Sequence, residues 1–242
     1  MDFYVFEKKF GGSFRNKYIR GSFINMIPSI KTTIYRLAKH DFRNAFAPYS
    51  RPRNLRPYKK NLLSPLGRGF IRLCPWEADY LYSIASLSRK GILEIGRFQG
   101  GSTFLLRASA PESTPVHSID IAPIDDGNLT RLLNKFGLNR LLHLYIDDSV
   151  TTEIHCQFEY DVLWIDGDHS YEGCLSDLRR FTPRLVSGGH ILLHDAYSGS
   201  PVFNAINTFI SENTAIKPIN NIFKPTHHWQ DPHGSIAHLI KS

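Results

Sequence analysis

Residues 91–103, GILEIGRFQGGST, decide the fold of this chain. Residues 92–95 are an apolar run, broken only by Glu94, and this run predicts a buried parallel strand. Glycines follow at positions 96, 100 and 101, so the backbone can turn tightly before a helix that is expected to begin at residues 102–107. Glycine also lets a ligand approach the main chain, and the amide groups at a helix start attract electron-rich groups. We therefore interpret the stretch as a nucleotide-binding turn.

The spacing of these residues indicates which nucleotide would bind. A dinucleotide-binding turn is expected to show the pattern GxGxxG, whereas here Glu94 precedes Gly96 and the next glycine, Gly100, follows four residues later. A carboxylate at this place repels a pyrophosphate but suits a cationic ligand, and S-adenosylmethionine carries both a sulfonium and an ammonium group. The alternative is a strand-to-helix turn that binds no ligand.

The pattern ExGxxxG resembles the first motif of class I S-adenosylmethionine-dependent methyltransferases. In that family the acid helps to hold the methionine end of the cofactor. The resemblance implies that Glu94, Gly96, Gly100 and Ser102 contact S-adenosylmethionine.

Length and composition are those of a soluble globular protein: 242 residues, 42% hydrophobic and 21% charged. One domain plus an extension is the expectation for this length. No apolar stretch approaches the roughly 18 residues that span a bilayer, and the first residues lack the basic-then-apolar layout of a secretory signal, so we expect a cytoplasmic protein. Cys74, Cys156 and Cys174 are widely spaced and are expected to be core or surface thiols, not a disulfide framework or a zinc site.

Charge divides the chain into two parts. Residues 1–90 carry 18 Lys and Arg against 5 Asp and Glu, a net charge of +13, whereas residues 91–242 carry a net charge of −6. Within an N-terminal extension at residues 1–72, apolar positions recur at helical spacing and predict an amphipathic helix at about 27–46, followed by a Pro- and Arg-rich linker at about 48–65. The basic face of this helix carries Lys31, Arg36, Lys39 and Arg43.

Two interpretations of that basic face stay open. The helix can pack on the rest of the chain with its charges in solvent. It can also bind an anionic membrane surface, a nucleic acid or an acidic substrate, and the first of these would make the protein peripheral to a membrane. A homo-oligomer formed through the extension is a further expectation.

The remaining residues, 73–242, alternate between strand-like and helix-like segments. Further strands are predicted at 116–121, 141–146, 160–165 and 189–193, with candidates at 215–219 and 235–241, and helices near 76–88 and 202–211. This alternation predicts an α/β domain with a Rossmann-like, doubly wound, mostly parallel sheet covered by helices on both faces. The periodicity shows five strands well; the methyltransferase resemblance implies seven, with an antiparallel last strand.

Acidic residues recur at the carboxyl ends of the predicted strands, which is the edge where open α/β sheets bind ligands. Asp120 ends the second strand, where an acid in nucleotide-binding folds accepts the two ribose hydroxyls; the alternative is a solvent-facing acid. Asp148 and Ser149 follow the third strand, at the place where the methyltransferase superfamily contacts adenine, although Asp147 can take this role by a shift of one residue.

The most specific stretch is residues 161–197, DVLWIDGDHSYEGCLSDLRRFTPRLVSGGHILLHDAY. It resembles a subgroup of class I methyltransferases that contains sugar and natural-product O-methyltransferases and cephalosporin-hydroxylase-like proteins, through an IDGxHxY motif followed by GG and a His-Asp pair. The resemblance covers residues 75 to about 200. It implies that Asp166, His194 and Asp195 hold a divalent cation and that His169 is the general base, with Asp166 also beside the cofactor.

These residue types suit proton removal from a hydroxyl. A divalent cation lowers the pKa of a coordinated oxygen while an imidazole takes the proton, and carboxylates favour Mg²⁺ or Mn²⁺. His194 departs from the acid that many metal-using relatives have, so the site could hold a softer metal or none. Without a metal, Asp166, His169 and Asp195 could still act as an orienting acid and base. The structural alternatives are a helix-start histidine bonded to Asp166 or Asp168, and an Asp195 that caps a strand end.

Other polar residues nearby are expected to have structural roles. Glu172 and Asp177 are expected to cap and solvate the following helix, and Gly188 and Gly189 to form the turn into the fifth strand. Tyr171 is expected to line the pocket.

The function that these residues favour is methyl transfer from S-adenosylmethionine to a hydroxyl of a small molecule, or of a sugar or glycan. A nucleic-acid (RNA) methyltransferase is the second hypothesis, supported by the basic first 90 residues; against it, the Asn/Asp-Pro-Pro-aromatic motif of amino-methylating enzymes is absent. A non-catalytic S-adenosylmethionine-binding domain is the third, and a NAD-dependent enzyme the fourth. Selectivity for the acceptor would depend on the extension and on a loop at 227–232.

Overall fold

The computed structural model describes residues 70–73, 75–219 and 235–242. The predicted helix at 27–46, the linker at 48–65 and the loop at 227–232 lie outside the described residues, as does Cys74. The structure therefore bears on the α/β domain. Of its two cysteines, Cys156 is an exposed thiol and Cys174 a buried one.

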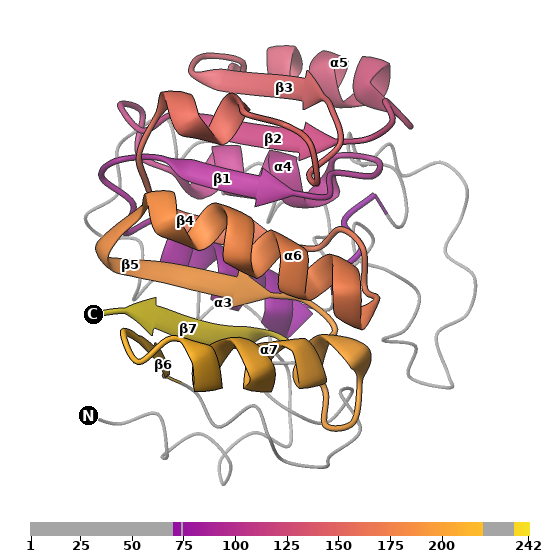
Figure 1. Cartoon of the computed structure of the whole chain (residues 1–242). Helices are drawn as coiled ribbons and strands as arrows, with labels where there is room; N and C mark the ends of the chain where they lie inside the picture. Colours follow the sequence, from indigo (N-terminus) through magenta and orange to yellow (C-terminus); the bar gives the residue numbers. More distant parts are fainter. Residues whose placement is uncertain (1–69, 74, 220–234) are drawn as a thin grey trace, which may run out of the picture.

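These residues form a seven-stranded sheet in the order β3-β2-β1-β4-β5-β7-β6. Its strands are β1 (Ile92–Ile95), β2 (Val116–Asp120), β3 (Leu142–Ile146), β4 (Tyr160–Ile165), β5 (Leu185–Leu193), β6 (Ile216–Pro218) and β7 (Ala237–Lys241). β7 is antiparallel to both of its neighbours, and the other adjacent pairs are parallel. In Figure 1 the arrowheads of β1, β2, β3 and β5 point one way and that of β7 the other. The seven strands and the antiparallel last strand are confirmed.

Helices cover both faces of the sheet (Figure 1). One face carries α3 (Pro75–Ala85), α4 (Gly101–Ser109) and α5 (Asp126–Phe136), and the other carries α6 (Tyr171–Phe181) and α7 (Pro201–Glu212). Short 3₁₀ turns, η3 (Ile154–Gln157) and η4 (Thr182–Arg184), precede β4 and β5. None of the described helices has the length and apolar character that crossing a bilayer requires.

The central strands supply side chains to two cores, because successive residues of a strand point to opposite faces. Ile92 and Trp164 pack with the helices of one face, and Leu93 and Leu163 with those of the other. All four side chains are fully buried. The unbroken burial of β1 and most of β4 is typical of central parallel strands covered on both faces.

β5 differs from its prediction, because it begins at Leu185 and not at Gly189. Gly188 and Gly189 therefore lie within the strand, and the expectation that they form a turn before it is wrong. The pairing register with β4 shifts between Tyr160 and Val162, and Gly188 has a φ of 77°. A glycine pair marks either a turn or an irregularity within a strand, and the sequence pattern does not separate the two.

Candidate active site

Glu94 lies in β1 with its side chain fully buried. One carboxylate oxygen accepts a hydrogen bond from Ser102 Oγ at 2.5 Å, and the other accepts from Thr103 Oγ1 at 2.5 Å and Ser118 Oγ at 2.6 Å. Burial raises the pKa of Glu94 to about 7, although the three hydroxyls and the charge of Arg97 act in the opposite direction. The structure thus shows Glu94 bound to other residues of the protein: Ser102 and Thr103 at the start of α4 and Ser118 of β2. The cofactor-binding roles of Glu94 and Ser102 stay predictions.

The glycines of the turn let other residues of this chain pack closely against its backbone. Gly96 has a φ of 88°, and a Cβ there would lie 2.2 Å from the carbonyl oxygen of Asp166. Gly100 has a φ of 84° and is the N-cap of α4, where a Cβ would meet the Leu129 side chain at 2.5 Å. Both positions therefore require glycine, because the left-handed backbone and the neighbouring atoms leave no room for a side chain. Their contact with a cofactor remains predicted.

Asp120 ends β2 beside the turn. Its Oδ2 accepts hydrogen bonds from the backbone N–H groups of Arg97 at 2.6 Å and Phe98 at 2.7 Å, and its Oδ1 accepts from that of Ala122 at 2.9 Å. The carboxylate is half-buried and ties the glycine turn to the end of the next strand. Asp120 is thereby held at the carboxyl edge of the sheet, where it was predicted to bind ribose.

The sequence does not predict the role of Arg97, which anchors the glycine turn to the strands and the helix beside it. Its side chain is fully buried and forms a bidentate ion pair with Asp126 of α5, at 2.8 and 2.9 Å. It also donates to the carbonyl oxygens of Ser118 in β2 at 3.1 Å and Tyr145 in β3 at 3.2 Å. An arginine between glycines suggests an exposed charge or a ligand contact. The fold shows instead that the partners of Arg97 are other residues of this chain and not a ligand.

The ends of β1, β2 and β3 expose apolar side chains at this edge. The exposed fractions are Phe98 47%, Ile121 73%, Ile124 53%, Ile146 60% and Val150 55%. Asp148 and Ser149 lie between the last two, half-buried, and Asp148 Oδ1 accepts a hydrogen bond from the N–H of Val150 at 2.9 Å. Exposed apolar residues gathered at one edge mark a surface that a ligand can cover.

The prediction for Asp177 is wrong, because its side chain is buried. It was expected to solvate α6, but it is 1% exposed, and its Oδ2 has no hydrogen-bond partner among the described residues. Burial raises its pKa to about 6; a hydrogen bond with Ser149 opposes that rise, while the charges of Asp168 and Asp148 add to it. The N-cap of α6 is instead Ser170, whose Oγ accepts from the N–H of Gly173 at 3.0 Å. Glu172 is exposed in the first turn of the helix, as expected.

The predicted base and the predicted metal ligands come together at the ends of β4 and β5. His169 Nε2 lies 3.1 Å from Asp166 Oδ1, and His169 Nδ1 lies 3.3 Å from Asp195 Oδ2. His194 Nδ1 lies 3.0 Å from the same oxygen of Asp166. Asp195 has a φ of 53°, a left-handed conformation that is uncommon outside glycine. The structure thus holds His169 between two acids from adjacent strands.

Glu77 of α3 completes this cluster and was not predicted. Its side chain is 6% exposed, and its Oε2 lies 3.4 Å from His194 Nε2. Its Oε1 accepts hydrogen bonds from the N–H and Oγ of Ser235, at 2.8 and 3.0 Å. An acid in the first turn of a helix is usually interpreted as a partner of the helix dipole, so the sequence offered no signal for this contact.

The cluster shifts the pKa values of its members. Burial alone would raise the pKa of Asp166, but the charge of His194 and the hydrogen bonds from both histidines outweigh it and lower the pKa to about 2. Burial opposes a charge on His194, yet Asp166 and Glu77 together raise its pKa well above the ordinary value. The hydrogen bond to Asp166 raises the pKa of His169, against the opposing effect of burial.

The divalent cation stays a prediction. The predicted ligands lie close together, since His194 Nδ1 is 3.0 Å from Asp166 Oδ1 and 3.8 Å from Asp195 Oδ1. Asp166, His169 and His194 each offer a ligand atom within 4.8 Å of the others, and this set, with two imidazoles, suits a softer cation better than the Mg²⁺ or Mn²⁺ that carboxylate oxygens favour. Both ring nitrogens of His194 also face carboxylate oxygens. The chemistry derived below therefore passes through no metal.

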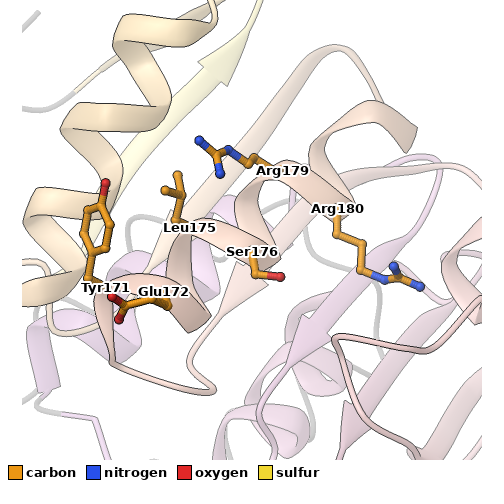
Figure 2. Close-up of a pocket in the computed structure, with 6 residues that line it drawn as sticks. All are labelled: Tyr171, Glu172, Leu175, Ser176, Arg179 and Arg180. Carbon is orange, nitrogen blue, oxygen red and sulfur yellow. The ribbon is translucent and has the colours of Figure 1, made fainter.

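A surface pocket of 650 Å³ lies elsewhere, on the outer side of α6. Figure 2 shows its lining: Tyr171, Glu172, Leu175, Ser176, Arg179 and Arg180. Tyr171 lines this pocket and shares a hydrogen bond of 3.0 Å with Thr208 of α7. None of the predicted cofactor, base or metal residues belongs to it, so we place the candidate site at the carboxyl edge of the sheet on the chemistry of its residues.

The chain is similar to known methyltransferases. Residues 93–196 match the model of a methyltransferase domain family, a span that includes every predicted site residue. No curated protein sequence matches the chain at a significant level. The sequence match and the fold together support an S-adenosylmethionine-dependent methyltransferase.

Solved methyltransferases share the fold. An O-methyltransferase from Bacillus cereus, solved in complex with SAH, is 15% identical with a TM-score of 0.54 and covers 93% of this chain and 96% of its own. TomG from Streptomyces achromogenes, an O-methyltransferase involved in tomaymycin synthesis and solved with SAM, is 11% identical with a TM-score of 0.56, and the match covers 93% of this chain and 94% of TomG. The methyltransferase PaMTH1 from Podospora anserina, bound to SAH, is 12% identical with a TM-score of 0.56, and the match covers 90% of this chain and 89% of PaMTH1. At these identities the likeness shows the fold and leaves the acceptor open.

Proposed function

We propose that this protein transfers the methyl group of S-adenosylmethionine to a hydroxyl of a small molecule, or of a sugar or glycan. The observation that carries the proposal is His169, held between Asp166 and Asp195 at the same sheet edge as Asp120 and the glycine turn. A hydroxyl acceptor needs a base, and a histidine oriented by acids suits that task. The O-methyltransferases among the solved relatives agree with this choice.

Cofactor binding would use the ends of β1, β2 and β3. Asp120 would accept the ribose hydroxyls, and the residue directly after it, Ile121, is 73% exposed and available to cover the adenine. Asp148 or Ser149 would contact the polar edge of the base. The methionine end would then extend along β1 toward Asp166, because β4 is the next strand in the sheet.

The reaction needs one proton acceptor and no redox partner. The acceptor oxygen attacks the methyl carbon, and the sulfur keeps the electron pair of the broken C–S bond. The proton of the acceptor passes to Nδ1 of His169, whose contact of 3.3 Å with the more exposed acid, Asp195, would open to admit the hydroxyl. The products are a methyl ether and S-adenosylhomocysteine, and the proton leaves from His169 to solvent. Holding oxygen, carbon and sulfur in line can account for about 7 to 11 kcal/mol of the barrier.

Calorimetric titration with S-adenosylmethionine and with NAD tests the cofactor. We expect saturable binding of S-adenosylmethionine alone, and Asp120→Ala to weaken it by about 1 to 3 kcal/mol because the ribose hydroxyls lose their acceptor. Glu212→Gln is the control, because it changes only an exposed ion pair between Glu212 of α7 and Arg179 of α6, and this variant should bind normally. Absence of heat from S-adenosylmethionine, or binding of NAD in its place, would refute the proposal.

His169→Ala tests the base. Turnover should fall by about 10²- to 10⁴-fold, the usual contribution of a positioned base, while cofactor affinity stays as in the wild type. The measurement uses a panel of hydroxylated acceptors and follows S-adenosylhomocysteine release. A variant with full turnover would remove His169 from the mechanism.

A further inference from the structure

Three side chains of different chemistry meet at η3, on the connection from β3 to β4. Glu153 directly precedes this turn, and His155 and Cys156 lie within it. Cys156 Sγ is 3.2 Å from Glu153 Oε2 and 3.5 Å from His155 Nε2. One ligand atom from each residue lies within 4.8 Å of the other two. None of the three residues belongs to the candidate active site.

Packing holds the histidine of this cluster in place. His155 is 5% exposed, and its ring meets that of Phe181 edge-on, with the ring centroids 4.8 Å apart. Its Nδ1 is buried without a well-formed hydrogen bond among the described residues, and its Nε2 faces the thiol. A buried imidazole with so few polar contacts calls for a further partner. Glu153 and Cys156 are exposed, so an ion can reach the cluster from solvent.

The three ligand types are those of a zinc site. Thiolate, imidazole and carboxylate groups bind Zn²⁺ in proteins, usually at the corners of a tetrahedron. With Zn–S of about 2.3 Å and Zn–N or Zn–O of about 2.0 to 2.2 Å, two ligand atoms of such a site lie about 3.5 Å apart. Both distances from Cys156 Sγ are close to that value, so an ion would require only small shifts of the side chains. Three protein ligands leave the fourth position to water.

Arg180 of α6 fixes the acid of the cluster from its other side. Its Nη2 lies 2.8 Å from Glu153 Oε1 and also donates to the carbonyl oxygen of Thr152. The ion pair occupies one carboxylate oxygen, while the other, Oε2, faces the thiol. Outer contacts of this kind orient the ligands of a metal. The positive charge of Arg180 also opposes a further cation, so we expect reversible binding instead of a permanently loaded site.

We propose that Glu153, His155 and Cys156 form a reversible Zn²⁺ site on the connection between β3 and β4, separate from the candidate active site. The spacing of the cysteines does not predict it, because the ligands beside Cys156 are a histidine and an acid and not a second cysteine. A thiolate and an imidazole favour Zn²⁺ over Mg²⁺ and Ca²⁺, which prefer oxygen ligands.

Titration of the reduced full chain with Co²⁺, which occupies zinc sites, tests the ligands. Co²⁺ bound by a thiolate gives a near-ultraviolet absorption band, which should saturate at one ion per chain and be abolished by Zn²⁺ but not by Mg²⁺. Cys156→Ser should remove the band, and Glu153→Gln should weaken binding by at least about tenfold. Both variants change exposed side chains and should fold as the wild type does. Glu159→Gln, which alters an exposed acid on the same connection, is the matched control and should leave the titration unchanged.

The absorption band separates this site from the cluster of Asp166, His169 and His194, which contains no thiol. An ion bound only at that cluster would give no thiolate band. Absence of the band in the wild type, its survival in Cys156→Ser, or wild-type affinity in Glu153→Gln would each overturn the proposal.

Protection of the thiol gives a second readout. Exposed Cys156 should react with iodoacetamide, and saturating Zn²⁺ should slow this reaction by at least about tenfold because the ion occupies the thiolate. Mg²⁺ should not change the rate, and mass spectrometry of the peptide follows Cys156 itself. Equal rates with and without Zn²⁺ would contradict the assignment. Neither test measures activity or cofactor binding, so the outcome is independent of the proposed methyl transfer.

Discussion

At the scale of single residues, the site departs from expectation where a polar side chain is buried. Asp177 looks like a surface residue of an amphipathic helix, since the sequence around it alternates charged and apolar residues, but it is almost fully enclosed. Its raised pKa means that the folded state holds a proton that the unfolded chain releases. Ionised Asp177 therefore costs stability at neutral pH.

Asp177→Asn should stabilise the protein in a pH-dependent way. Because the folded pKa is about 6 and the unfolded value is 3.8, the wild type should lose stability as the pH rises from about 4 to about 6 and should stay at the lower level above that. The variant should gain about 2 to 3 kcal/mol at about pH 8 and nothing below about pH 4, by denaturant unfolding at each pH. Glu172→Gln on the same helix is the control and should change the free energy of unfolding by less than about 0.5 kcal/mol. A less stable Asp177→Asn variant at about pH 8 would show that a favourable partner holds the carboxylate.

At the scale of elements, Arg97 links the glycine turn to β2, β3 and α5. Its side chain donates four hydrogen bonds, two to the Asp126 carboxylate and two to carbonyl oxygens, so the turn is fixed before any ligand arrives. Preorganised contacts of this kind lower the cost of binding.

Arg97→Met should destabilise the fold by about 3 kcal/mol, since it leaves Asp126 without its buried partner, and it should weaken S-adenosylmethionine binding by loosening the turn. Urea unfolding and calorimetry measure the two effects. The matched control is Arg179→Met, which breaks an exposed pair with Glu212 and should cost no more than about 1 kcal/mol. Equal losses of stability in the two variants would mean that the buried ion pair contributes no more to stability than the exposed one.

Most of the secondary structure, and part of the candidate site, can be predicted from the sequence. Strand positions, the parallel sheet and the gathering of Asp166, His169 and Asp195 follow from apolar runs and from the rule that parallel strands end at one edge. The contacts of Glu77 could not be predicted, because its hydrogen bonds to Ser235 span 158 positions of sequence and its contact with His194 joins α3 to the end of β5. The partners of Glu94 were equally hidden, since an acid before a glycine turn suggests a ligand whether it faces a pocket or three hydroxyls.

At the scale of the whole molecule, charge is distributed unevenly between residues 1–90 and the rest of the chain. The net charge of +13 in residues 1–90 predicts attraction to an anionic surface, with a strength that falls as salt rises. The predicted basic face at Lys31, Arg36, Lys39 and Arg43 is the feature to test.

Replacing these four residues with Glu in the full chain should weaken binding to phosphatidylserine vesicles by at least about a hundredfold, because each basic residue near such a surface contributes about 1 kcal/mol. Vesicle sedimentation at low salt measures the loss, and neutral phosphatidylcholine vesicles serve as the blank. Unchanged binding would favour the other interpretation, a helix whose charges are simply solvated. A gel-shift assay with RNA separates a nucleic-acid preference from a membrane preference.

The order of the strands has a consequence for synthesis of the chain. β7 lies between β5 and β6 although it follows both in sequence, so β6 has no neighbour in the sheet until residues 237–241 have left the ribosome. Until then β5 presents a bare edge of unpaired amides and carbonyls, which neighbouring nascent chains could extend. A stop codon shortly before Ala237 should therefore yield insoluble protein instead of a trimmed but working domain.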